Sequence, residues 1–95
     1  VASYEIALGL RPDNPIAMNN LAWLLRERDQ DRALVLARNA RDLAPESPAI
    51  LDTYGWLLHL SGNHQQAKAV MEEALALAPE NQEIKDHLDS INQAL

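Results

Sequence analysis

Two aspartates, Asp52 and Asp86, are 34 residues apart. They are the residues of this chain that are best suited, by type and spacing, to act as a general acid and a general base. Paired carboxylates can serve as general acid and general base. Such a reaction also needs a nucleophile, an oxyanion donor or an enclosed pocket, and the surrounding sequence indicates none of them. We therefore expect a solvated acidic face that attracts a basic segment of a partner, and we expect no enzyme.

The three histidines, His59, His64 and His87, are the other groups that could ligate a metal. They lack the His-Glu-x-x-His spacing, and the chain contains no cysteine, which excludes thiolate sites and disulfides. We expect these histidines to be ordinary polar residues, with no metal site and no cofactor. His59 follows Trp56 by three residues, so the two side chains share one face of a predicted helix that could bind a partner.

Two tryptophans, Trp23 and Trp56, are 33 residues apart and could anchor a partner. Tryptophan is enriched at binding hot spots, where its truncation costs about 2 kcal/mol or more. The alternative is that the two indoles only pack against neighbouring helices and against each other, because large aromatic side chains are often buried. Both interpretations stay open at this point.

Charge and hydropathy narrow the class of partner. The net charge is −6, and residues 48–95 hold two basic and seven acidic groups, so the clustered cations that nucleic-acid binding needs are missing. The longest apolar stretches are far shorter than the roughly 20 residues that cross a bilayer. We expect a soluble segment, cytoplasmic or periplasmic, without nucleic-acid binding or direct membrane insertion.

Three short proline-containing segments recur along the chain and divide it. These segments, 12–15, 45–48 and 79–81, begin 33 and 34 residues apart. Between them apolar residues recur at helical spacing, and a period near 34 indicates stacked helical hairpins. The helical stripes comprise Met18, Leu21, Ala22 and Leu25, then Leu51, Tyr54, Gly55 and Leu58.

Residues that start and stop helices stand at the expected places. Asn14, Ser47 and Asn81 are suited to cap the first helices of successive units. Gly62 suits a left-handed stop, and Asn63 suits a restart of the second helix. The first hairpin has no glycine at that point, so its turn must close differently.

These features divide the chain into four parts. Residues 1–14 are predicted to be the second helix of an incomplete repeat, and 15–47 and 48–81 are each predicted to be a repeat. Residues 82–95 form the predicted C-terminal capping helix, with Ile84, Leu88 and Ile91 facing inward.

The pattern resembles the tetratricopeptide repeat, whose signature is W-x2-L-G-x2-Y, then A-x3-F-x2-A and a closing proline. The second hairpin follows it with Leu51, Tyr54, Gly55, Leu58, Ala67, Met71, Ala74 and Pro79. The first follows it with Met18, Leu21, Ala22, Leu25, Ala33, Ala37, Ala40 and Pro45, and departs where Ala37 replaces a bulky residue. The resemblance implies an all-α, right-handed superhelical stack of antiparallel hairpins, an α-solenoid. A generic helical bundle is the alternative fold.

The resemblance also implies a protein-interaction scaffold that holds a partner peptide or helix in a concave groove. Carried over by position, the groove consists of Asn19, Trp23, Arg26, Asp52, Thr53, Trp56, His59 and Asp86, with Glu83 and His87 at corresponding places in the last helix. Some cochaperones of the family grip a terminal carboxylate with lysines and asparagines. Trp23, Asp52 and Trp56 stand where such a clamp needs amides and cations, so chaperone-tail recognition is not expected.

Two further interpretations concern assembly. The first helix would expose an apolar edge for self-association, which predicts a homo-oligomer and consists of Val1, Tyr4, Ala7 and Leu8. The stretches 20–25 and 54–58 resemble bacterial members of the family, often found in envelope assembly or secretion. We expect a fragment of a larger bacterial protein, and a partner protein or peptide that is basic or apolar.

Overall fold

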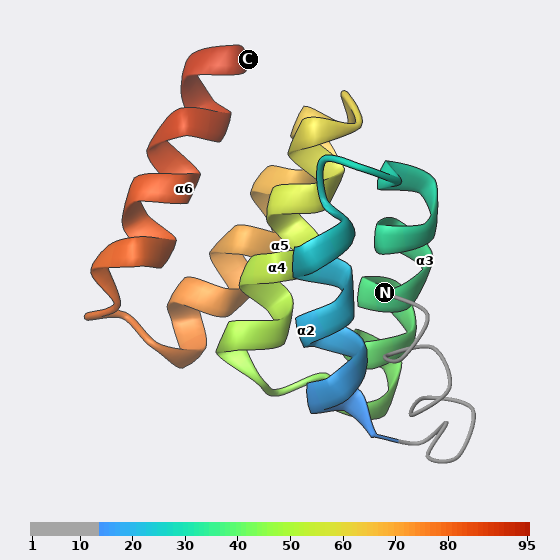
Figure 1. Ribbon diagram of the computed structural model, residues 1–95. Helices are drawn as coiled ribbons and strands as arrows, with labels where there is room; N and C mark the ends of the chain where they lie inside the picture. The colour runs from blue at the N-terminus through green and yellow to red at the C-terminus, as the bar shows by residue number, and fades with distance from the viewer. Residues whose placement is uncertain (1–13) are drawn as a thin grey trace.

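The computed structural model describes residues 14–95 and places five α-helices in them (Figure 1). The described part contains no strand. The helices are α2 (Pro15–Leu25), α3 (Gln30–Leu43), α4 (Pro48–Leu60), α5 (His64–Leu77) and α6 (Gln82–Ala94). The predicted all-α stack of antiparallel hairpins is confirmed. The predicted self-association edge at Val1, Tyr4, Ala7 and Leu8 lies outside the described residues.

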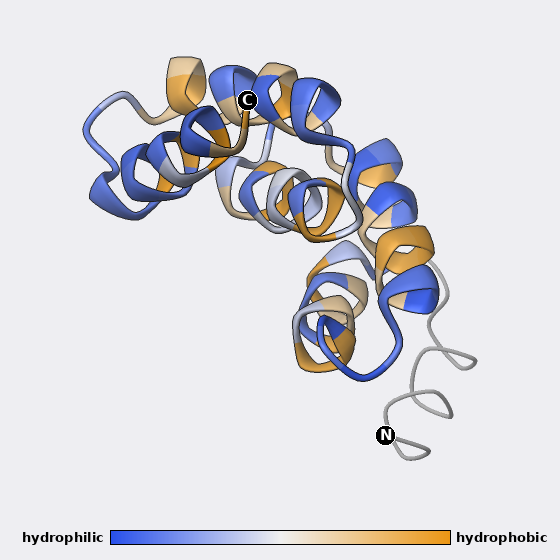
Figure 2. Cartoon of the chain, turned by 90° about the horizontal axis from the view of Figure 1, so that it is seen from above, coloured by the Kyte–Doolittle hydropathy of each residue, from blue (hydrophilic) through white to orange (hydrophobic). Residues whose placement is uncertain are grey.

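The five helices are arranged as two hairpins followed by one more helix. Helix α2 packs on α3, α4 packs on α5, and α4 also contacts both α2 and α6. Seen from above, the stack is an arc with α2, α4 and α6 on its inner side and α3 and α5 on its outer side (Figure 2). Three helices from successive units therefore share one concave surface.

Side-chain caps fix where four of the helices begin. The predicted caps Asn14, Ser47 and Asn81 each accept a hydrogen bond from a first-turn amide, at 3.1, 3.5 and 3.1 Å. Asp29 caps α3 in the same way, by accepting from the Arg32 amide at 3.2 Å. These contacts satisfy amides that a helix leaves without partners. Asn63 is the N-cap residue of α5, as predicted, but its side chain makes no cap hydrogen bond, because its Nδ2 donates to Ser61 Oγ instead.

The two hairpins turn in different ways. Gly62 has φ of +92° and is the one residue of 14–95 in the left-handed region, as its sequence context predicted. The first turn needs no such residue, since the amides of Arg28 and Asp29 both donate to the carbonyl of Leu25. A helix-like turn thus replaces the glycine stop.

The apolar stripes of all five helices merge into one core. Every position of the predicted stripes is buried, and the three alanines of α3 are fully enclosed. Ile84 and Ile91 join the core from α6, and Leu88 packs against it. Each large side chain buried in this way contributes about 1.5–3 kcal/mol. In 14–95, no helix combines the length and the apolar character that spanning a bilayer requires.

Candidate functional site

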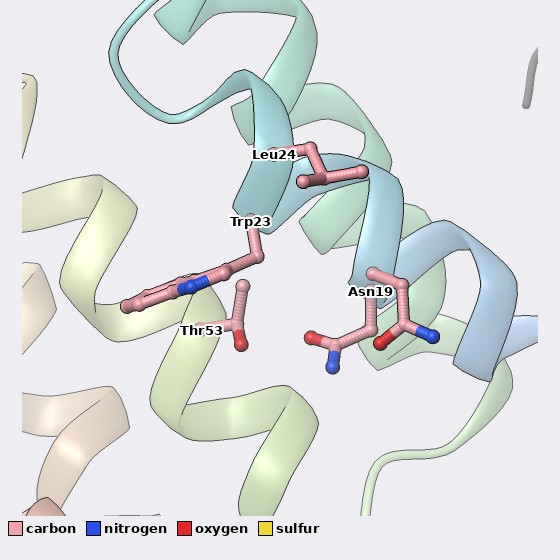
Figure 3. Close-up of a pocket in the computed structure, with 5 residues that line it drawn as sticks. Asn19, Trp23, Leu24 and Thr53 are labelled. Atoms are coloured by element: carbon pink, nitrogen blue, oxygen red, sulfur yellow. The ribbon is translucent and has the colours of Figure 1, made fainter. Parts of the chain in front are cut away.

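Two adjoining clefts lie on the inner surface of the arc. We call the larger one, about 390 Å³, the Trp23 cleft; Asn19, Asn20, Trp23, Leu24 and Thr53 line it (Figure 3). The smaller one, about 170 Å³, is the Asp52 cleft, lined by Asn19, Trp23, Ala49, Asp52, Thr53, Asn81, Glu83 and Ile84. Residues of α2 and α4 line both clefts, and the start of α6 completes the second.

The indole of Trp23 forms a wall of both clefts. It reaches from α2 toward α4, where Thr53 lies (Figure 3). The guanidinium of Arg26 lies 4.2 Å from the ring centroid, and its Nη1 donates to the Trp23 carbonyl at 2.7 Å. Arg26 therefore holds the half-buried ring in place through a cation–π contact.

Asn19 brings an unsatisfied acceptor to the same place. Its Oδ1 is enclosed and accepts no hydrogen bond, and the residue lines both clefts. An enclosed acceptor without a donor costs about 1–3 kcal/mol. Thr53 cannot serve as that donor without giving up its own bond, since its hydroxyl donates to the Ala49 carbonyl at 3.1 Å.

Asp52 and His87 form a pair across α4 and α6. The distance from His87 Nδ1 to Asp52 Oδ1 is 2.7 Å, and the two side chains are 18% and 12% exposed. The hydrogen bond to Asp52 raises the pKa of His87 above 6.5, and the charges of Asp52, Glu83 and Asp86 act in the same direction, against burial. The imidazolium form is thus favoured beside this carboxylate.

The acidic residue that joins this pair is Glu83. Donor atoms of Asp52, Glu83 and His87 all lie within 4.8 Å of one another. Asp86, which the sequence analysis placed beside Asp52, is exposed and accepts a hydrogen bond from Gln82 Nε2 at 2.9 Å. The predicted carboxylate pair is therefore replaced by two carboxylates and an imidazole.

Trp56 belongs to a row of rings with the histidines. It stacks on His87 at 4.5 Å between centroids, lies 4.9 Å from His59, and packs against the core. His59 and His64 share a hydrogen bond of 2.8 Å between their Nδ1 atoms. Burial lowers the pKa of His59, and positive charge on His64 and His87 lowers it further. The histidines are thus part of a specific cluster, which the sequence analysis did not predict.

The eight groove residues inferred from sequence divide into three groups. Asn19, Trp23, Asp52 and Thr53 line the clefts, and Arg26 covers Trp23. Trp56 and His59 lie in the ring cluster, and Asp86 stays exposed on α6. The sequence analysis did not place Asn20, Leu24, Asn81 and Ile84 in the groove. The helical period could have identified Asn20 and Leu24, since one turn separates them beside Trp23.

Comparisons with known proteins match this chain to a family model, to a relative and to a solved structure. Residues 48–81 match the family model described as tetratricopeptide repeat. The TPR repeat-containing protein PA4667 of Pseudomonas aeruginosa is 34% identical over 88 residues, which cover 88% of this chain. The chain spans only 14% of the length of that relative. Among solved structures, the first TPR of Spaghetti (RPAP3) bound to the HSP90 peptide SRMEEVD is similar, with a TM-score of 0.87 and 25% identity. That match covers 96% of this chain and 73% of the other.

Proposed function

This chain belongs to the tetratricopeptide-repeat family, and on that premise we propose that its inner surface binds a segment of another protein. The fold neighbour holds a peptide, which supports an interaction scaffold here. We further propose that 15–47 and 48–81 are repeat units, that 82–95 is the capping helix, and that the chain is part of a larger bacterial protein. The observation that carries the proposal is the Trp23 cleft, in which an indole and a leucine lie beside the side-chain amides of Asn19 and Asn20.

The Trp23 cleft offers both apolar area and a polar contact. Its volume of about 390 Å³ falls in the range of ordinary ligand sites. Trp23 and Leu24, of which Leu24 is 48% exposed, would cover an apolar side chain of the partner. The exposed side-chain amide of Asn20, which lines the same cleft, would exchange hydrogen bonds with the partner's backbone.

The charge of the groove favours basic residues next to that apolar anchor. Asp52 and Glu83 line the adjoining cleft, and residues 48–95 are strongly acidic. We therefore expect the peptide SRMEEVD, which carries three acidic side chains, to bind more weakly than a version with lysines at those places. The difference should shrink with added salt, because charges are screened over about 8 Å at physiological ionic strength.

A peptide selected from a random twelve-residue phage library on the immobilised chain provides a direct test. Trp23→Ala should raise the Kd of the selected peptide about 30-fold, which corresponds to about 2 kcal/mol for a tryptophan anchor. Val35→Ala is the control, because Val35 is exposed on α3 and lines neither cleft. Trp56→Ala should mainly lower the melting temperature, since its ring packs on the core and on His87.

Three results would contradict the proposal. Selection that enriches no peptide would leave the surface without binding activity. Unchanged affinity in a folded Trp23→Ala variant would exclude the Trp23 cleft. Enrichment of acidic rather than basic or apolar sequences would overturn the proposed partner chemistry.

A further inference from the structure

Three potential metal ligands meet between α4 and α6. Glu83 and His87 are four residues apart on α6, and side chains at this spacing share one helix face. Asp52 joins them from α4, and the donor atoms of all three lie within 4.8 Å of one another. Two ligands on one helix and a third on its neighbour therefore converge on a single point.

The donor atoms lie close enough together for small side-chain movements to bring them around one ion. Zinc binds carboxylate oxygen and imidazole nitrogen at about 2.0–2.2 Å, so ligand atoms around a tetrahedral zinc lie about 3.4 Å apart. The distance from Asp52 Oδ1 to His87 Nδ1 is 2.7 Å, which is a hydrogen-bond distance, so a zinc ion would replace the shared proton and move these two atoms slightly apart. Glu83 is exposed, and its flexible side chain can close the remaining distance without moving the backbone.

Two carboxylates and one imidazole carry a net negative charge even when His87 is protonated, and a metal ion would take the place of the proton between Asp52 and His87. Asp52 is only 9% exposed, and the three side chains together carry two negative charges when the imidazole is neutral. Asn19, whose Oδ1 accepts no hydrogen bond, lines the same cleft as Asp52 and Glu83. A buried carboxylate is stabilised by a metal ion.

We propose that Asp52, Glu83 and His87 bind one divalent transition-metal ion of the zinc type. An imidazole nitrogen with carboxylate oxygens is a donor set that zinc accepts, whereas magnesium and calcium prefer oxygen ligands alone. Three protein ligands leave a coordination position for water or for a group of a bound partner. Because the ligands come from α4 and α6, the ion would also fasten the last helix to the stack.

Isothermal titration of the chelator-treated, dialysed chain with ZnCl₂ tests this inference. We expect one ion per chain, a rise in melting temperature because the ion binds only the folded site, and a change in tryptophan emission because Trp56 stacks on His87. Glu83→Gln and His87→Gln should each weaken binding at least 10-fold. MgCl₂ should give no saturable binding.

Asp86→Asn is the matched control, because it removes one carboxylate from the same helix at an exposed position. Its zinc affinity should fall far less than that of Glu83→Gln, because Asp86 acts on His87 only through its charge. Glu83→Gln changes an exposed residue and keeps the test valid if His87→Gln fails to fold. No stoichiometric binding, or equal losses in Asp86→Asn and Glu83→Gln, would overturn the inference. The titration uses no peptide, so its outcome is independent of the proposed partner binding.

Discussion

The two hairpins solve the same packing problem with different side chains. In α4–α5, Gly55 faces Met71, and a Cβ on Gly55 would lie 3.0 Å from Met71 Cε. At the equivalent positions of α2–α3 stand Ala22 and Ala37, both fully buried. A glycine with a long, flexible side chain and a pair of alanines thus allow similarly close packing. The lesson is that the repeat preserves the filling of space at this contact, while the residue types vary.

The largest effect is expected from a substitution that removes the contact between Gly55 and Met71 in the second hairpin. Met71 is fully buried, so Met71→Ala should lower the free energy of unfolding by about 2–5 kcal/mol. Adding Gly55→Ala should restore part of that loss, because the new methyl group no longer meets Met71 and alanine favours helix by about 1 kcal/mol over glycine. Urea denaturation of the single and double variants measures both. A double variant no more stable than Met71→Ala would contradict the comparison.

The second largest effect on stability is expected in the turns that join the two helices of each hairpin. Gly62→Ala should cost about 1–2 kcal/mol, because its φ of +92° is unfavourable for a residue with a Cβ even though the space around it is open. Arg28→Ala, in the corresponding turn, should leave stability nearly unchanged, since that turn has no positive φ. Thermal unfolding of the two variants distinguishes the turns. Equal losses would show that the difference in backbone conformation has no energetic consequence.

The starts of the two second helices differ by a smaller amount. Asp29→Ala should cost about 1 kcal/mol, because the carboxylate caps α3. Asn63→Ala should cost only a few tenths, because Asn63 makes no cap hydrogen bond to α5. Chemical denaturation at one pH checks the pair. An Asn63→Ala loss as large as that of Asp29→Ala would contradict the difference in capping.

The smallest effect concerns pH and the ring cluster beside α6. Burial and the charges of His64 and His87 hold the pKa of His59 below 6.5 in the folded chain. The unfolded chain therefore binds this proton more readily, and the folded state loses stability as pH falls from above 6.5 through the lowered value. His59→Gln should gain stability relative to the unmodified chain between pH 8 and pH 5, measured with a chelator present. A constant difference over that range would exclude the effect.

Sequence reasoning worked where structure depends on neighbours within one helix or turn. The buried stripes, the caps at Asn14, Ser47 and Asn81, and the left-handed Gly62 follow from local periodicity and backbone chemistry. The start of α5 at Asn63 was also predicted, but the cap hydrogen bond does not form there, because the side-chain amide donates to the Ser61 hydroxyl. Sequence patterns do not show which of two nearby hydrogen-bond partners a side chain takes.

The candidate site is built from contacts between helices that are far apart in the sequence, and sequence patterns do not show which of these contacts form. Asp52 and His87 are 35 residues apart, and which acidic residue of α6 approaches them is set by the rotation of that helix on α4. The repeat period placed Asp86 opposite Asp52, whereas the packing brings Glu83 there. The same rotation stacks His87 on Trp56, so the two tryptophans have different surroundings despite equivalent positions.

The most direct test of peptide binding by the inner surface is an amide chemical-shift titration of the labelled chain with the library-selected peptide. The account predicts that the largest shifts occur at Asn19, Asn20, Trp23 and Thr53, while Val35 on α3 and Leu77 on α5 stay unchanged. Shifts concentrated on α3 and α5, with the Trp23 cleft unaffected, would contradict it.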